Sequence, residues 1–210
     1  MKNLKIITLQ LVALLFVGGL FTSCLDDDDD DVSFSYLSKS EQLQAFYQLA
    51  GTHSGRVYWL ADSSSYTKLD SIDVTLNAAN DSTIYIYNFP TKPLAQYVND
   101  GERELKDSLE KQDNVTLTIY TAYFHLSPIY FEADPYNITY NMTYGGESHK
   151  VEVAFYTGMP NYLYGEYDST SSPQLVIRMC QGAIWVDRDT DDTNPTNHMS
   201  TSQNFVFQSN

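Results

Sequence analysis

Cysteine and basic residues are scarce in this sequence, and both shortages exclude classes of protein. Only two cysteines occur in 210 residues, Cys24 and Cys180, so a secreted scaffold held by several disulfides is excluded. Lysine and arginine together number 12 against 27 aspartates and glutamates, which gives a net charge of −15. Such a charge repels nucleic-acid phosphate, so we expect no nucleic-acid partner.

The usual catalytic motifs are missing as well. The chain has no G-x-S-x-G, H-E-x-x-H or C-x-x-C motif and no glycine-rich phosphate loop. Its histidines stand singly, at His53, His125, His149 and His198. Paired carboxylates for glycoside hydrolysis need a spatial separation of about 5 to 9 Å, which spacing along a β-rich chain does not reveal. Such a pair would come from Glu132, Asp134, Glu166 and Asp168. We therefore predict no catalytic residues and a protein that is not an enzyme, with a hydrolase as the least favoured alternative.

One long hydrophobic run is present, from Ile6 to Leu20, after the basic residues Lys2 and Lys5. Polar residues and glycines interrupt it, so it falls short of the roughly 20 apolar residues that a membrane span requires. A short apolar run after a basic start is typical of a secretory signal peptide.

The next residues, Thr22-Ser23-Cys24, resemble the lipobox of bacterial lipoproteins, in which small residues precede a lipid-bearing cysteine. The resemblance implies a signal peptide over 1–23 and lipid attachment at Cys24, with the membrane as a partner through that anchor. Two or more acyl chains give stable anchoring.

Six aspartates, Asp26 to Asp31, follow the cysteine almost at once. Like charges in a row repel one another and stay solvated, so we expect a spacer here, within a lipidated acidic tether over 24–36. The arrangement also resembles the surface-export signal of Bacteroidetes-type outer-membrane lipoproteins. That resemblance implies an outer-membrane location, exposed at the cell surface.

The remaining residues, 37–210, suffice for one β-rich domain. Ser38 and Glu41 form a capping box that predicts a helix over about 39–50. Period-two alternation then predicts eight to ten short strands in an antiparallel β-barrel or β-sandwich. We expect strands at 55–60, 72–76, 83–89, 115–126, 138–144, 150–156 and 204–207, a short edge strand at 129–132, and a pair at 175–179 and 183–186 around Gln181-Gly182. A short crossover helix is predicted over 102–111.

The stretch from Leu49 to Tyr58 contains Gly51-Thr52-His53-Ser54-Gly55 just before the first predicted strand. It resembles the opening of calycin-like and related uncharacterised Bacteroidetes lipoprotein families. The resemblance implies a barrel with an internal ligand cavity.

Exposed tyrosines in a loop are the main candidates for ligand binding, because sugar rings dock on aromatic faces. Tyr162, Tyr164 and Tyr167 lie in a predicted loop and are our candidate ligand-binding residues. Trp59 and Trp185 lie within strand-like runs, where packing in the sheet is the expected role.

The acidic loop from Asp187 to Asp192 is the one candidate metal site. Oxygens at Asp187, Asp189 and Asp191 would suit Ca²⁺, but the loop lacks the glycine and glutamate of an EF-hand. A solvated acidic loop is the favoured interpretation, with no resident cofactor. Cys180, in a strand-like run, is expected to be a buried small hydrophobic residue.

The sequence thus predicts an outer-membrane or surface-anchored lipoprotein whose non-catalytic β-domain binds an extracellular ligand, such as a glycan, a lipid or a small hydrophobic molecule. The alternative is a structural or accessory subunit of an outer-membrane protein complex.

Overall fold

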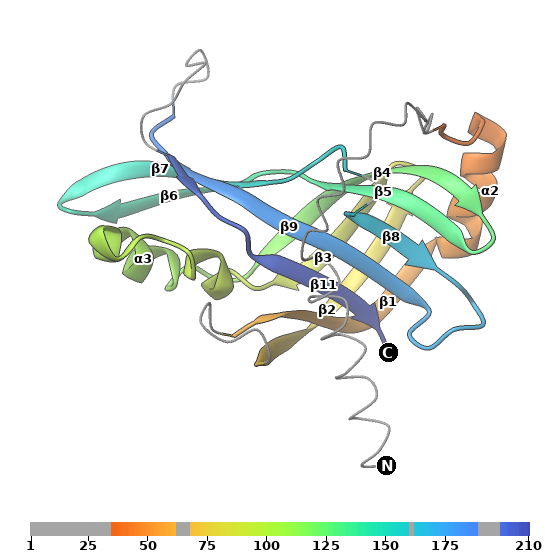
Figure 1. Ribbon diagram of the computed structural model, residues 1–210, viewed down its shortest axis with the longest axis horizontal. Coiled ribbons are helices and arrows are strands. Elements are labelled where there is room, and N and C mark those ends of the chain that lie inside the picture. Colours follow the sequence, from red (N-terminus) through yellow and green to blue (C-terminus); the bar gives the residue numbers. More distant parts are fainter. Residues whose placement is uncertain (1–34, 62–67, 160–161, 189–197) are drawn as a thin grey trace, which may run out of the picture.

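The computed structural model describes residues 35–61, 68–159, 162–188 and 198–210 (Figure 1). The predicted signal peptide, the lipid-attachment residue Cys24 and the aspartate run lie outside the described residues. No helix within the described ranges is long and apolar enough to cross a membrane.

Among the described residues, two α-helices and two short 3₁₀ helices accompany the strands. Helix α2 (Lys39–Leu49) begins at the predicted capping box, where the Ser38 backbone N–H donates to Glu41 Oε2 at 2.9 Å. It ends before Gly51, whose φ of +111° turns the chain into the first strand. The connection between β3 and β4 holds the other three: η1 (Lys92–Ala95), η2 (Asp100–Glu102) and α3 (Arg103–Leu109).

The strands account for most of the chain, as period-two alternation predicted. They are β1 (Gly51–Leu60), β2 (Leu69–Asn80), β3 (Thr83–Phe89), β4 (Val115–Leu126), β5 (Ile129–Pro135), β6 (Ile138–Tyr144), β7 (Glu147–Phe155), β8 (Tyr164–Tyr167), β9 (Leu175–Val186), β10 (His198–Ser200) and β11 (Asn204–Ser209).

Eight of these strands close into an antiparallel barrel in the order β11-β1-β2-β3-β4-β5-β8-β9. The pairing of β9 with β11 completes the ring, for example through Ile177 opposite Phe207. The sequence did not distinguish a β-barrel from a β-sandwich, and the closed ring of strands shows that the fold is a barrel. Helix α2 packs against β4 and β2 and buries Ala45 and Leu49 fully.

The second half of β9 leaves the barrel and pairs with β7, which pairs with β6, while β10 lies on the other side of β9. We call these strands the arm. Figure 1 shows β9 running from the barrel into the arm, with α3 beside the β6–β7 hairpin. Gly145 and Gly146 make the hairpin turn with φ of +61° and +84°. Fully buried Leu94 and Leu109 come from the β3–β4 connection, which therefore covers one face of the arm.

Three local predictions were wrong. Residues 129–132 are not an edge strand: β5 extends to Pro135 and lies between β4 and β8, because Ile129, Phe131 and Ala133 all supply core side chains. The predicted hairpin around Gln181-Gly182 is instead the continuous strand β9. Gln181 needs no turn there, since its side chain is fully buried and donates to Leu94 O at 3.1 Å. Finally, Tyr164 and Tyr167 lie in strand β8 rather than in a loop.

Candidate ligand-binding face on the barrel exterior

Large side chains fill the inside of the barrel. Tyr123, Phe131, Phe205 and Phe207 are all fully buried. Gly165 makes room for one of them, because a Cβ atom at that position would overlap the Phe131 ring. The calycin resemblance implied a ligand cavity inside, but packing of this kind favours a site outside.

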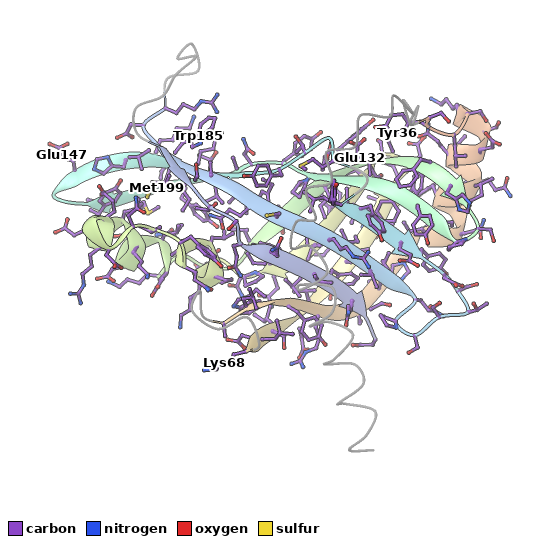
Figure 2. All side chains as sticks on the ribbon, in the orientation of Figure 1. Tyr36, Lys68, Glu132, Glu147, Trp185 and Met199 are labelled. Atoms are coloured by element: carbon purple, nitrogen blue, oxygen red, sulfur yellow. The ribbon has the colours of Figure 1, made fainter. Side chains whose placement is uncertain are left out.

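On the outside, alternate residues of β4, β5 and β8 gather aromatic rings around carboxylates. Register places Tyr120 opposite Asp134, and Glu132 opposite Tyr164. We call this surface the tyrosine face and define it by Tyr36, Tyr120, Phe124, Tyr130, Glu132, Asp134 and Tyr164. Figure 2 shows Tyr36 and Glu132 meeting above β4 and β5.

A buried carboxylate lies at the centre of the tyrosine face. Glu132 is only 5% exposed, and its Oε2 accepts a hydrogen bond of 2.6 Å from the Tyr36 hydroxyl. This bond, together with burial and the nearby negative charges, raises the pKa of Tyr36 to about 12. The hydroxyl therefore stays protonated and fixes the orientation of the carboxylate.

Asp134 lies two residues along the same strand and on the same side. Its Oδ1 accepts from the Gly158 backbone N–H at 2.9 Å. Burial raises the pKa of Asp134, and the neighbouring Glu132 adds to the rise through its charge and a side-chain hydrogen bond. The two carboxyl groups are therefore neighbours on one side of β5.

The other side of the tyrosine face is a stack of rings. Tyr130 lies nearly parallel to Phe124 at 6.1 Å between centroids and meets Tyr164 edge-on at 5.7 Å. The guanidinium of Arg178, on the neighbouring strand β9, lies 4.5 Å from the centre of the Tyr164 ring. These contacts hold the rings in fixed positions, which lowers the entropy cost of binding a ligand on them.

The three predicted ligand-binding tyrosines separate in the structure. Tyr164 belongs to the tyrosine face. Tyr162 is 70% exposed in a turn. Tyr167 packs against the barrel core and meets the His53 ring edge-on at 6.2 Å between centroids. Of the three, only Tyr164 combines an outward position with fixed neighbours.

Of the three predicted calcium ligands, the structure describes Asp187, since Asp189 and Asp191 lie outside the described residues. Its Oδ2 contacts His149 Nδ1 at 2.7 Å, and its Oδ1 accepts from the Lys150 backbone N–H at 2.8 Å. The hydrogen bond with His149 is the main cause that lowers the pKa of Asp187. Both oxygens thus fasten the end of β9 to β7. Among the described residues, no three His, Cys, Asp or Glu side chains form a metal-binding group.

Cys180 and the tryptophans lie in or against the sheet. Cys180 is 8% exposed, and burial raises the pKa of its thiol to about 11. Trp59 packs on the barrel core, while Trp185 carries the Arg188 guanidinium 3.3 Å from its ring centre. These positions agree with the expected packing roles.

Comparison with protein families finds a match over most of the barrel. The profile described as "Domain of unknown function (DUF4840)" matches residues 48–186. The chain belongs to the DUF4840 family. The matched span of the DUF4840 domain holds the barrel strands from β1 to β9, and β11 closes the same barrel just beyond it. Neither curated proteins nor solved structures match the chain.

Sequence reasoning missed most of the tyrosine face. Glu132 and Asp134 were recognised only as two of several acidic residues, and Tyr36, Tyr120 and Tyr130 were not singled out. Their alternation within predicted strands gave a usable signal, because Glu132 and Asp134 share a strand face with Tyr130. The contact between Tyr36 and Glu132 spans 96 positions, and no local pattern encodes it.

Proposed function

We propose that this protein is a lipid-anchored lipoprotein of the Bacteroidetes type, located in the outer membrane and exposed at the cell surface. Its non-catalytic β-domain binds a glycan outside the cell. The anchor is the lipid on Cys24, and the aspartates after it act as solvated spacer and export signal. The grounds for this part are the lipobox resemblance and the charge run.

The single observation that supports glycan binding is the tyrosine face. Exposed rings such as Tyr120, which is 42% exposed, offer flat apolar surfaces for the faces of a sugar, and the half-buried Asp134 offers a hydrogen-bond acceptor for its hydroxyls. Aromatic surface interleaved with carboxylates suits a ligand that is itself half apolar and half polar. A lipid or a purely hydrophobic ligand would leave the carboxylates without partners.

The same geometry supports a binding role over a catalytic one. Glu132 is only 5% exposed, and its Oε2 already accepts a hydrogen bond from the Tyr36 hydroxyl. In retaining and inverting hydrolases both carboxyl groups must instead reach the glycosidic bond or the attacking water.

A second candidate function is that of an accessory subunit in an outer-membrane protein complex. Exposed apolar side chains near the tyrosine face favour it: Tyr136 is 59% exposed, Met159 40% and Tyr162 70%. The hydrogen bond from Gly158 to Asp134 holds the 158–159 segment close to β5. Crosslinking in intact cells that recovers one membrane protein would support this function.

The glycan hypothesis is tested by titrating the full-length chain, in mild detergent, with a panel of neutral and acidic oligosaccharides. We expect at least one oligosaccharide to raise the melting temperature and to bind measurably by calorimetry. Tyr120→Ala should weaken that binding about tenfold, because the variant removes an exposed ring, and stacking of a nucleic-acid base on one aromatic ring contributes on the order of 1–3 kcal/mol.

Tyr87→Ala is the matched control. Tyr87 is 41% exposed and Tyr120 42%, but Tyr87 lies on β3, away from the tyrosine face. Equal loss of binding in both variants, or no response to any member of the panel, would overturn the proposal.

A further inference from the structure

A groove adjoins the tyrosine face, across Tyr164 and Arg178. Its volume is about 380 Å³, and its walls include Glu166 of β8, Arg178 of β9, Gln208 of β11 and the 168–174 connection. Small-molecule sites typically begin at about 300 Å³. The groove is therefore large enough for a sugar-sized ligand.

Two of the residues that line this groove carry buried hydrogen-bond donors without a partner. Gln208 is only 4% exposed, and its Nε2 atom is buried without a hydrogen bond. Nη1 of Arg178 is buried and unpartnered in the same way. Buried donors in folded proteins are nearly always paired, so an unpaired one on a residue that lines a groove points to a ligand that supplies the acceptor.

The acceptors in the groove differ in availability. Asp168 is engaged by its own loop, since it accepts from Thr170 N at 2.8 Å, Thr170 Oγ1 at 2.7 Å and Ser171 Oγ at 2.9 Å. Glu166 has only a long contact of 3.5 Å from the Tyr130 hydroxyl. Although both residues are described, no ion pair within 4.0 Å joins Glu166 to Arg178. The Glu166 carboxylate is thus available as an acceptor beside two donors that have no hydrogen-bond partner.

Charge decides between ligand classes. The negative charge of Glu166 offsets the positive charge of Arg178, and the chain as a whole carries −15. An anionic ligand would meet repulsion on approach and next to Glu166. A hydroxyl group both accepts and donates, so a pair of neighbouring hydroxyls satisfies the two donors and the carboxylate together.

We infer that this groove binds a neutral sugar through two adjacent hydroxyl groups. One hydroxyl accepts from Gln208 Nε2, the other accepts from Arg178 Nη1, and a hydroxyl proton is donated to Glu166. The sugar lies beside the Tyr164 ring, which continues the aromatic surface. The inference rests on the proposed function and adds to it a second subsite and a ligand charge.

The experiment uses the full-length chain in mild detergent, with maltohexaose, cellohexaose, laminarihexaose and mannohexaose as neutral probes and trigalacturonate as the acidic probe. Gln208→Met keeps the side-chain length but removes the donor. Arg178→Lys keeps the charge but removes the guanidinium. We expect a neutral probe to bind, and each substitution to weaken its binding at least tenfold.

Gln48→Met is the control, because Gln48 is exposed on α2, away from the groove. A second readout separates binding from folding. Gln208 Nε2 has no hydrogen bond to lose in the free protein, so the melting temperature of Gln208→Met without ligand should equal or exceed that of the parent chain.

Each outcome bears on a different statement. If a neutral probe binds the parent chain and both groove variants equally, but binds Tyr120→Ala more weakly, the groove inference is overturned and the glycan-binding proposal stands. Binding of trigalacturonate alone overturns the neutral charge of the ligand. If no probe binds the parent chain, glycan binding and the groove inference both fail.

Discussion

At the scale of single residues, Asp134 is a half-buried group whose charge state depends on its surroundings. Burial and the neighbouring Glu132 raise its pKa in the folded chain. The folded state then holds the proton more tightly than the unfolded state. Asp134 therefore favours folding at low pH, and this contribution is lost as the pH rises from the ordinary aspartate range through the raised folded pKa.

Asp134→Asn removes that ionisation and keeps an Oδ1 acceptor for the Gly158 backbone N–H. We expect the variant to melt at a higher temperature than the parent chain at pH 7 and at nearly the same temperature at pH 3. Differential scanning calorimetry at both pH values measures the difference. Asp113→Asn, at an exposed position, should change the melting temperature equally at both. A gain for Asp134→Asn that is as large at pH 3 as at pH 7 contradicts the shift.

Gly165 is a second single residue on which the barrel depends. A Cβ there would overlap the Phe131 ring, which fills the barrel interior. We expect Gly165→Ala to lower the free energy of unfolding by about 3 kcal/mol or more, since overpacking costs roughly 1–3 kcal/mol even where neighbours yield. Urea unfolding followed by circular dichroism gives the value.

Gly101→Ala serves as the control for this substitution, because a Cβ at Gly101 meets nothing within 4 Å. The double variant Gly165→Ala/Phe131→Leu should recover part of the loss by removing the overlapping ring atoms. Equal stability of the two single variants would show that Phe131 moves away at little cost.

At the scale of elements, helix α2 depends on its capping box. Ser38→Ala should lower the free energy of unfolding by about 1 kcal/mol, which corresponds to about 2–4 °C in melting temperature for a chain of this size. The reason is that Ser38 and Glu41 satisfy donors at the start of the helix. Gln44→Ala, at an exposed position inside the helix, should have no such cost. Thermal unfolding of both variants, side by side, checks the difference.

Sequence patterns predict elements well where the pattern is local. The capping box of α2 and the strand predicted at 138–144 are both confirmed. The same logic failed at Gln181-Gly182, which looks like a turn between two strands. The buried Gln181 side chain donates a hydrogen bond to the backbone carbonyl of Leu94, 87 positions away. No neighbouring residue reveals that partner.

The tyrosine face was out of reach for the same reason. Alternation places Glu132, Asp134 and Tyr130 on one side of β5, but it does not say whether that side is inside or outside a barrel. Only closure of the ring through β11 makes it the outer side. The idle donors Arg178 and Gln208 come from different strands, and they share a groove because β9 and β11 pair.

At the scale of the whole molecule, barrel and arm are joined by strand β9 and by the Phe89 ring. The first half of β9 pairs with β8 and β11, and the second half pairs with β7 and β10. The Phe89 ring lies 5.0 Å from Phe205 of the barrel and 6.3 Å from Phe155 of the arm. We therefore expect the described domain to unfold as one cooperative unit.

The two tryptophans allow a direct test, because Trp59 lies in β1 of the barrel and Trp185 in the arm half of β9. Trp185→Phe leaves fluorescence from the barrel, and Trp59→Phe leaves fluorescence from the arm. In each variant, the fluorescence midpoint in urea should coincide with the midpoint from far-ultraviolet circular dichroism. An arm signal that changes at lower urea than the circular dichroism of the same variant would show two units.

The hydrogen bond between Tyr36 and Glu132 also fixes where the N-terminal end of the described chain meets the barrel. That point lies on the tyrosine face. Fully extended, the stretch from Cys24 to Ser35 reaches about 40 Å at most. With lipid on Cys24, the proposed binding surface would stay within that radius of the bilayer. Its ligand would then be a glycan presented close to the membrane, and long chains would be gripped near their membrane-proximal end.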